Sequence, residues 1–321
     1  MELAIVFLGT AGAVPTPTRS SPAVLVQRGG ERLLFDCGEG TQRQLMRAGV
    51  GFNQIGAIHL THLHADHYMG IPGMLKTWQL WGRLEPIKIY GPRGLIELSE
   101  IIKRILGRFD FAVEWIELAP GDILPGDGYR IQTIHTHHKI PSLGYALIEE
   151  PRPGRFDVQR AIELGVPSGP AFGRLQKGET IEVDGRLVHP EDVLGPERPG
   201  RKIVISGDTR PSKDLVEISQ GAQLLVHEAT FTSDALDRAK ETGHSTAFEA
   251  ATIARDAEVD LLALVHLSFR HAPRELLAEA REIFPSTILP SDLDRLSVPF
   301  PAKGTLALDA SAKRSIPDEE I

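Results

Sequence analysis

The run His62-Leu63-His64-Ala65-Asp66-His67 constrains this chain more than any other feature of its sequence. It directly follows Ala57–Leu60, a short apolar segment typical of a buried strand. Neutral imidazoles and carboxylates are good ligands for Zn²⁺ and similar divalent ions. In an extended turn His62 and His64 point the same way, and Asp66 and His67 can face a second ion as the chain enters a helix. This density of ligand-type residues favours a metal site over a solvated histidine-rich loop.

Three further candidate ligands follow predicted strands. His138 comes after a strand that ends near residue 134, Asp208 follows Ile203–Ser206, and His266 follows Leu261–Val265. Each alone is more typical of a turn residue, but strand ends that meet at one edge could bring all three to the same site. Spacing does not choose between His138 and its neighbours His135 and His137. The histidines without such a context, which we interpret as structural or surface residues, are His59, His189 and His271.

Two bound ions would indicate hydrolysis of a phosphodiester. Ions about 3.5–4 Å apart can hold a bridging hydroxide and stabilise the attacking and leaving oxygens. Asp66 is placed to orient or deprotonate that water, and the departing oxygen needs an acid. Glu228 in His227–Thr230 could keep the imidazole of His244 protonated for this purpose. Alternatively, Ser245 or Thr246 caps a helix while His244 lies in solvent, and spacing favours neither reading.

Composition sets wider limits. The 321 residues suffice for one large domain or two small ones. No apolar run is long enough to span a membrane, and Met1–Thr10 is typical of a strand rather than of a signal peptide. Cys37 is the only cysteine, which excludes a disulfide framework and a thiolate zinc cluster. A cytoplasmic location is therefore the default expectation.

The net charge of −8 argues against a nucleic-acid partner, but the charge is unevenly distributed. Residues 76–108 hold seven Lys or Arg against three Glu, whereas residues 205–260 hold eleven acids against five bases. Candidate metal ligands lie in the acidic stretch, where bound cations would offset part of the charge. A polyanionic substrate is therefore compatible with the sequence.

The hydrophobic pattern predicts two halves of short strands and helices. In the first half we expect strands at Leu3–Leu8, Ala23–Gln27, Arg32–Phe35, Ala57–Leu60, 111–117, 129–134 and 143–148, and helices at Thr41–Ala48, Met69–Trp81 and Pro92–Leu106. In the second half we expect strands at Lys202–Ser206, Gln223–Val226 and Leu261–Val265, and helices near Ser212–Ser219, Thr246–Asp256 and Arg274–Ile283. Two such halves suggest two packed sheets flanked by helices.

An excursion separates the halves. Residues 151–200 contain fifteen Gly or Pro, which excludes a core element. The segment is too long for an ordinary loop, so we expect a functional excursion or a disordered segment, with a short helix possible at Arg155–Leu164. Residues 152–177 hold five bases against two acids in an acidic protein.

These motifs resemble the metallo-β-lactamase superfamily and, within it, the ribonuclease Z family of tRNA 3′-processing endonucleases. His62–His67 matches the superfamily signature His-x-His-x-Asp-His, which does not distinguish substrates. The narrower resemblance lies in His227–Thr230, in Gly243–Ala247 and in the excursion, which is similar to the tRNA-gripping arm of the short bacterial form. The resemblance implies an α/β (α+β) αββα four-layer sandwich, with a catalytic domain at 1–300, an inserted flexible arm at 151–200 and a C-terminal tail at 301–321.

The resemblance also implies roles for individual residues. One metal would be held by His62, His64, His138 and Asp208, and the other by Asp66, His67, Asp208 and His266. The context before Pro141 and Gly144-Tyr145 selects His138. His244 would donate a proton to the leaving oxygen, with Glu228 as its partner. The residues expected to contact substrate are Arg19, Thr209, Arg270, Gly169 and Pro170. Two Zn²⁺ per subunit are expected, with Mn²⁺ as an alternative, together with precursor tRNA as substrate, a homodimer and no membrane.

Pro15–Ser20 departs from the family pattern Pro-x-Lys-x-Arg-Asn, because Pro17 and Ser20 replace the Lys and the Asn. Cleavage after the discriminator base and cleavage after CCA therefore both stay open. Two other functions remain as alternatives. One is a hydrolase of the same fold that acts on small phosphodiesters or esters, and the other is a non-catalytic RNA-binding protein with a structural metal site.

Overall fold

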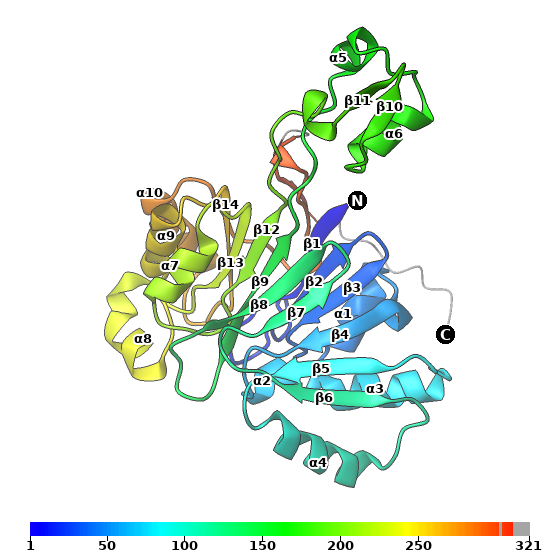
Figure 1. The fold of residues 1–321 in the computed structure, drawn as a ribbon. Coiled ribbons are helices and arrows are strands. Elements are labelled where there is room, and N and C mark those ends of the chain that lie inside the picture. The colour runs from blue at the N-terminus through cyan, green and yellow to red at the C-terminus, as the bar shows by residue number, and fades with distance from the viewer. Residues whose placement is uncertain (302–303, 311–321) are drawn as a thin grey trace.

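The computed structural model describes residues 1–301 and 304–310, which form two facing sheets with helices outside them (Figure 1). The strands of the first sheet are β1 Leu3–Gly9, β2 Ala23–Arg28, β3 Glu31–Phe35, β4 Ile55–His59, β5 Ile87–Gly91, β6 Val113–Glu117, β16 Arg295–Ser297 and β17 Ala307–Asp309. Within the described residues their order is β17-β16-β1-β2-β3-β4-β5-β6. The strands of the second sheet are β7 Ile123–Gly126, β8 Tyr129–His135, β9 Leu143–Glu149, β12 Lys202–Ile205, β13 Leu224–Glu228, β14 Leu261–Val265 and β15 Thr287–Ile288. Their order is β15-β14-β13-β12-β9-β8-β7.

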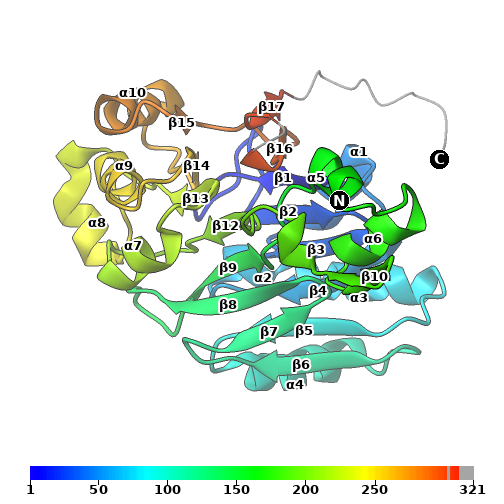
Figure 2. The ribbon, with the colours of Figure 1, turned by 45° about the horizontal axis from the view of Figure 1, so that its top comes forward.

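The helices lie on the outer faces of both sheets (Figure 2). Beside the first sheet are α1 Thr41–Ala48, α2 Ala65–Tyr68, α3 Gly70–Leu80 and α4 Leu95–Leu106, and beside the second are α7 Lys213–Ser219, α8 Leu236–Thr242, α9 Ala247–Asp256 and α10 Pro273–Ile283. One buried apolar cluster, which includes Phe7, Tyr145 and Val226, lies between the sheets. A second cluster lies between the first sheet and its helices, and a third lies between the second sheet and its helices. The expected αββα sandwich is confirmed.

The direction of the strands explains where polar residues collect. β12, β13 and β14 run parallel to one another. Their carboxyl ends therefore meet at one edge of the sheet, which is where open α/β sheets bind ligands. Asp208 follows β12, Glu228 ends β13 and His266 follows β14.

The predicted elements correspond closely to the observed ones, with a few differences. The helix expected from Pro92 begins only at Leu95, after Gly94 with its φ of 103°. Strands β5, β7, β15 and β16 and helix α8 were not expected. Part of the expected tail at 301–321 forms β17, and residues 311–321 lie outside the described residues. In the part of the chain that the structure describes, no helix has the length and apolar character needed to cross a membrane.

Residues 151–200 form a small unit that projects from the sandwich (Figure 1). Its elements are α5 Val158–Glu163, α6 Pro170–Gln176, β10 Ile181–Val183 and β11 Arg186–Val188. Side chains from the helices and the hairpin, among them Ala161, Leu175 and Val188, pack into a separate apolar cluster. We call this segment the arm.

A buried ionic cluster lies where the arm joins the sandwich. Glu149, at the end of β9, accepts hydrogen bonds from Arg28 Nε at 2.9 Å and from Arg201 Nε at 2.7 Å. All three residues are at most 6% exposed. The Arg201 guanidinium also stacks 3.9 Å from the ring centre of Phe300, and Arg152 stacks on the same ring at 3.4 Å. The carboxylate of Glu149 therefore compensates two buried guanidiniums at the root of the arm.

We predict that Glu149→Gln lowers the free energy of unfolding by about 3–5 kcal/mol, because buried Arg201 loses its carboxylate partner and buried Arg28 keeps only the more exposed Glu31, at 3.4 Å. Urea denaturation followed by circular dichroism measures this change. Glu150→Gln is the matched control, since Glu150 is the exposed neighbour, and it should leave stability unchanged. A loss below about 1 kcal/mol for Glu149→Gln would mean that the cluster is not a major source of stability.

Candidate metal centre

The loop after β4 turns directly into the short helix α2, and this turn places the motif side chains. Residue His64 is extended at φ −73° and ψ 147°, and α2 begins at the next residue. His62 and His64 therefore lie on the extended part, while Asp66 and His67 lie on the first helical turn. The helix amino terminus favours a carboxylate at that position.

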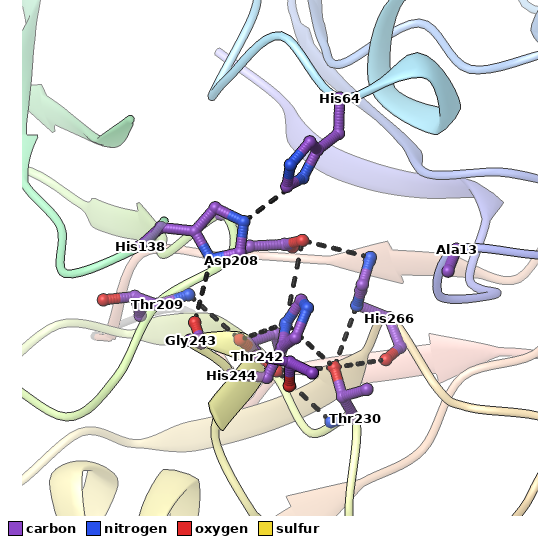
Figure 3. Close-up of polar contacts among 12 residues, drawn as sticks. Ala13, His64, His138, Asp208, Thr209, Thr230, Thr242, Gly243, His244 and His266 are labelled. Atoms are coloured by element: carbon purple, nitrogen blue, oxygen red, sulfur yellow. Dashed lines mark hydrogen bonds and ion pairs between the residues drawn. The ribbon is translucent and has the colours of Figure 1, made fainter. Parts of the chain in front are cut away.

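His62, His64, His138 and Asp208 form a first group, whose candidate ligand atoms all lie within 4.8 Å of one another. His64 Nδ1 lies 2.9 Å from His62 Nε2. It also lies 3.2 Å from His138 Nε2 (Figure 3). The structure brings His138 to this group and leaves its competitors outside. The ring of His135 packs against that of His137 at 4.7 Å, and His135 Nδ1 faces Asp214 at 3.8 Å.

A second group consists of Asp66, His67 and His266. Asp66 Oδ2 lies 3.5 Å from His67 Nε2 and 3.5 Å from His266 Nε2. Asp208 Oδ2 touches both groups, since it lies 3.5 Å from His62 Nε2, 3.5 Å from His67 Nε2 and 3.2 Å from His266 Nε2. The main-chain N–H of Ala13 donates to Asp66 Oδ2 at 3.0 Å and orients this carboxylate.

The hydrogen bonds on the far side of the rings show that these residues fit divalent cations. Four Nδ1 atoms have partners that take a proton: His62 with Thr61 Oγ1 at 3.0 Å, His67 with Asp36 Oδ2 at 2.8 Å, His138 with the Gly243 carbonyl at 2.8 Å, and His266 with Thr230 Oγ1 at 2.9 Å. These bonds leave each Nε2 with a lone pair aimed into the cluster, as metal-ligating histidines require. The buried Nε2 atoms of His67 and His266 have no hydrogen-bond partner among the described residues.

The electrostatics of the cluster show that its carboxylates attract positive charge, whether from a proton on His67 or from a cation. Burial, reinforced by the neighbouring His67, holds the pKa of His62 well below its ordinary value. Burial also disfavours a charge on His67, but the carboxylates of Asp36 and Asp208 outweigh it and raise the pKa of His67 well above its ordinary value. Burial opposes ionisation of Asp208, yet His266, His67 and His62 hold its pKa well below the usual range. The cluster is thus a set of carboxylates and imidazoles that attracts positive charge.

Asp36 is a functional residue that sequence reasoning missed. It follows β3 directly, has a positive φ of 57° and is buried. Besides binding His67, it accepts hydrogen bonds from the N–H of Thr61 at 2.8 Å and from the Thr61 hydroxyl. A carboxylate that orients a ligating histidine fixes its tautomer and raises its basicity. The signal that singled out Asp208, a polar residue directly after an apolar strand, could also have identified Asp36.

Glu228 and His244 form a pair beside the cluster. His244 Nδ1 lies 2.9 Å from Glu228 Oε1 and 3.8 Å from Asp208 Oδ2. Burial opposes a charge on His244, but the Glu228 carboxylate outweighs it and raises the pKa of His244 to about 9. Thr246 does cap helix α9, through a reciprocal pair of hydrogen bonds with Glu249. His244 nevertheless does not lie in solvent, because its side chain is only 14% exposed.

The remaining histidines and the expected substrate-contacting residues are dispersed. His59 is buried and stacks on Phe35 and Tyr90. Thr209 is buried beside the pair, where its N–H donates to Glu228 at 2.9 Å. Arg19 Nη1 donates to the Pro290 carbonyl at 2.9 Å and contacts Thr10. Arg270 is exposed and lies 5.3 Å from the ring centre of Phe269. Gly169 and Pro170 start α6 in the arm, away from the cluster (Figure 1).

Comparison with known proteins places this arrangement in a family. A family model described as anti-Pycsar protein Apyc1 matches residues 3–150. The crystal structure of the metallo-β-lactamase fold protein YhfI from Bacillus subtilis has a TM-score of 0.69 at 19% identity, covering 92% of this chain and 99% of that chain. The crystal structure of human tRNase Z, short form, has a TM-score of 0.66 at 30% identity, with the same coverage. Ribonuclease Z of Methanosarcina acetivorans is 46% identical over 302 residues, which cover 93% of this chain and 99% of that protein. The chain has the metallo-β-lactamase fold and belongs to the ribonuclease Z family.

Proposed function

We propose that this protein is an endoribonuclease that removes the 3′ trailer of precursor tRNA and leaves a 3′-hydroxyl on the tRNA. The observation that carries the proposal is the Glu228–His244 pair beside two groups of metal ligands, in a chain that resembles ribonuclease Z over nearly its whole length. The alternative of a small-substrate hydrolase leaves the arm without a role.

We infer that His62, His64, His138 and Asp208 hold one ion and that Asp66, His67, Asp208 and His266 hold the other. When bound, two Zn²⁺ would lower the pKa of a water molecule and neutralise charge on the phosphate oxygens. Mn²⁺ is accepted by the same donor set. Asp66 is both ligand and candidate base in this proposal, and the Ala13 N–H binds its Oδ2, the oxygen that also faces His67 and His266.

His244 serves as the general acid in this proposal. Its Nδ1–H is engaged by Glu228, so the proton on Nε2 is the one available for transfer. Water adds to phosphorus, the bond from phosphorus to the tRNA 3′ oxygen breaks, and His244 protonates that oxygen. The phosphate remains on the trailer. Arg210 secures the donor, because it binds Glu249 at 2.7 Å and donates to the His244 carbonyl at 2.5 Å.

The arm is the proposed tRNA-binding element. It enters at the end of β9 and returns at the start of β12, whereas Asp208 follows the end of β12. The arm and the cluster therefore lie at opposite ends of one strand. A tRNA held by the arm is presented away from the same chain's cluster, which supports a homodimer in which one arm serves the partner's site. We also infer a cytoplasmic location from the tRNA substrate.

Some of the basic side chains of the arm are paired with acidic ones, so fewer are available for phosphate contacts than its sequence suggests. Arg160 binds Glu163 at 3.2 Å and Arg174 binds Glu179 at 2.8 Å. Arg155 and Lys177 remain exposed and suited to phosphate contacts. Gly169 and Pro170 lie between Arg155 and Lys177 in the sequence. Their contacts with substrate remain a prediction, as do those of Arg19, Thr209 and Arg270.

A deletion tests the role of the arm. Removing residues 155–194 is structurally reasonable, because a Cβ built on Gly154 would lie 1.8 Å from the Gly195 carbonyl oxygen, so the two backbones already touch. We expect a variant with Gly154 joined to Gly195 by a two-residue Gly-Ser linker to lose about 100-fold in kcat/KM on precursor tRNA. Hydrolysis of bis(p-nitrophenyl) phosphate should stay within about threefold, because that substrate makes no distant phosphate contacts. A folded deletion variant that processes precursor tRNA at the full rate would exclude the arm as a binding element.

The acid assignment predicts two different pH profiles. We expect His244→Ala to lower kcat on precursor tRNA by about 10²–10⁴-fold. It should also remove the fall in rate on the alkaline side of the pH–rate profile, which we call the alkaline limb. Glu228→Gln removes the charge that raises the pKa of His244, so its alkaline limb should move to lower pH. The control is His135→Ala, whose side chain is 52% exposed and lies outside the cluster. If His244→Ala retains the alkaline limb of the unmodified protein, another group donates the proton.

A further inference from the structure

The hydroxyl of Thr230 occupies an unusual position in the candidate site. Thr230 follows β13 by two residues and is 6% exposed. Its Oγ1 lies 2.6 Å from Glu228 Oε2. It also lies 2.9 Å from His266 Nδ1 (Figure 3). It is also 3.4 Å from His244 Nδ1. One hydroxyl therefore touches both the proposed acid pair and a proposed metal ligand.

The direction of these hydrogen bonds follows from counting protons. Glu228 accepts at Oε1 from the Thr209 N–H at 2.9 Å and from His244 Nδ1 at 2.9 Å. It accepts at Oε2 from the N–H and the hydroxyl of Thr230, at 3.3 and 2.6 Å. Four donors fill the lone pairs of an ionised carboxylate. The single hydroxyl proton of Thr230 is thus directed to Glu228, in the shortest of these contacts.

The same count determines the tautomer of His266. With its proton directed to Glu228, Thr230 Oγ1 can only accept from His266, so Nδ1 carries the hydrogen. A neutral His266 then has its lone pair on Nε2, which lies 3.2 Å from Asp208 Oδ2 and 3.5 Å from Asp66 Oδ2, so the three acceptor atoms face a common position suited to a cation. Thr230 Oγ1 also lies 3.1 Å from the carbonyl oxygen of His266, whose φ is 56°, a left-handed conformation that is uncommon for a side-chain-bearing residue. The hydroxyl therefore contacts both the ring and the main chain of this ligand.

We propose that Thr230 is a positioning residue that couples metal binding at His266 to the orientation of the Glu228–His244 pair. A cation on His266 Nε2 makes the Nδ1–H a stronger donor, and that polarises the Thr230 hydroxyl toward Glu228. Hydrogen bonds in such a chain strengthen one another. The hydroxyl thus links the two halves of the site through side-chain hydrogen bonds. Thr61 and Asp36 bind each other instead, and Gly243 binds His138 through its main-chain carbonyl. The catalytic half rests on the proposed function, whereas the metal-binding half does not.

Thr230→Val and Thr230→Ser separate this role from packing. Valine keeps the shape of threonine but removes the hydroxyl partner of His266 Nδ1 and leaves Glu228 Oε2 with only the main-chain N–H of residue 230, at 3.3 Å. Serine keeps the hydroxyl. We expect Thr230→Val to weaken Zn²⁺ binding about 10–100-fold in competition with a chelator, as loss of an outer partner of a metal ligand typically does. We expect Thr230→Ser to restore affinity to within about threefold. In the precursor tRNA assay, the alkaline limb of the pH–rate profile should lie at a different pH for Thr230→Val. For Thr230→Ser it should lie at the pH found for the unmodified protein.

Thr133→Val is the matched control. Thr133 is 2% exposed and its hydroxyl donates to the Ala119 carbonyl at 2.6 Å, so it loses a buried hydrogen bond away from the cluster. It should change neither zinc affinity nor the pH profile. A folded Thr230→Val protein with unchanged zinc affinity would overturn the metal half of the proposal. Weakened zinc binding with an unmoved limb would overturn the coupling to the acid pair.

A measurement on the unmodified protein keeps the proposal testable if Thr230→Val does not fold. Long-range ¹H–¹⁵N spectra of the metal-free and zinc-loaded protein report the tautomer of each histidine. We expect His266 to carry its hydrogen on Nδ1 in both forms, and His266→Gln identifies its signal. A metal-free His266 with its hydrogen on Nε2 and none on Nδ1 would contradict the proposal. Neither this readout nor zinc affinity requires an RNA substrate, so failure of the proposed function would be seen separately.

Discussion

The buried carboxylate of Asp208 is the interaction on which the rest of the site depends. It is 3% exposed, and its Oδ2 faces ring nitrogens of His62, His67 and His266. A charge cannot be buried at this depth without compensating partners. These partners come from the loop after β4 in one sheet and from the end of β14 in the other. Closing the sandwich is therefore what assembles the metal centre, and a metal bound there would favour the closed fold.

In the proposed function, the chemistry and the binding of substrate occupy different parts of the chain. The ligand cluster is formed at strand ends and could serve many hydrolytic reactions, as its superfamily signature suggests. The arm is an insertion with its own apolar cluster, and its Arg152 stacks on Phe300, which also stacks against Arg201 of the sandwich. In the proposed function, the arm holds the tRNA at a distance from the reacting phosphate. This division explains why the cluster alone does not identify the substrate.

The sequence predicted the sandwich and the strand-end ligands because both follow from local patterns of apolar and polar residues. Spacing alone did not choose His138 over His135 and His137, since that choice depends on the path of the chain after β8. Asp36 and Thr230 were not assigned roles because their importance lies in contacts with His67 and His266, each more than thirty residues away. The arm was expected to be either functional or disordered, because its Gly and Pro obscured the helices and the hairpin. The pairing of Arg160 and Arg174 with acids was equally invisible to a count of charges.

The central claim is that a dinuclear centre in this chain cleaves precursor tRNA by activating water. The most direct measurement is a zinc titration of metal-depleted protein against a precursor tRNA, with analysis of both RNA ends. We expect activity to rise to a plateau at two equivalents of Zn²⁺ per chain, with a 3′-hydroxyl on the tRNA and a 5′-phosphate on the trailer. Cleavage at the full rate without metal, or a 2′,3′-cyclic phosphate on the tRNA, would contradict it.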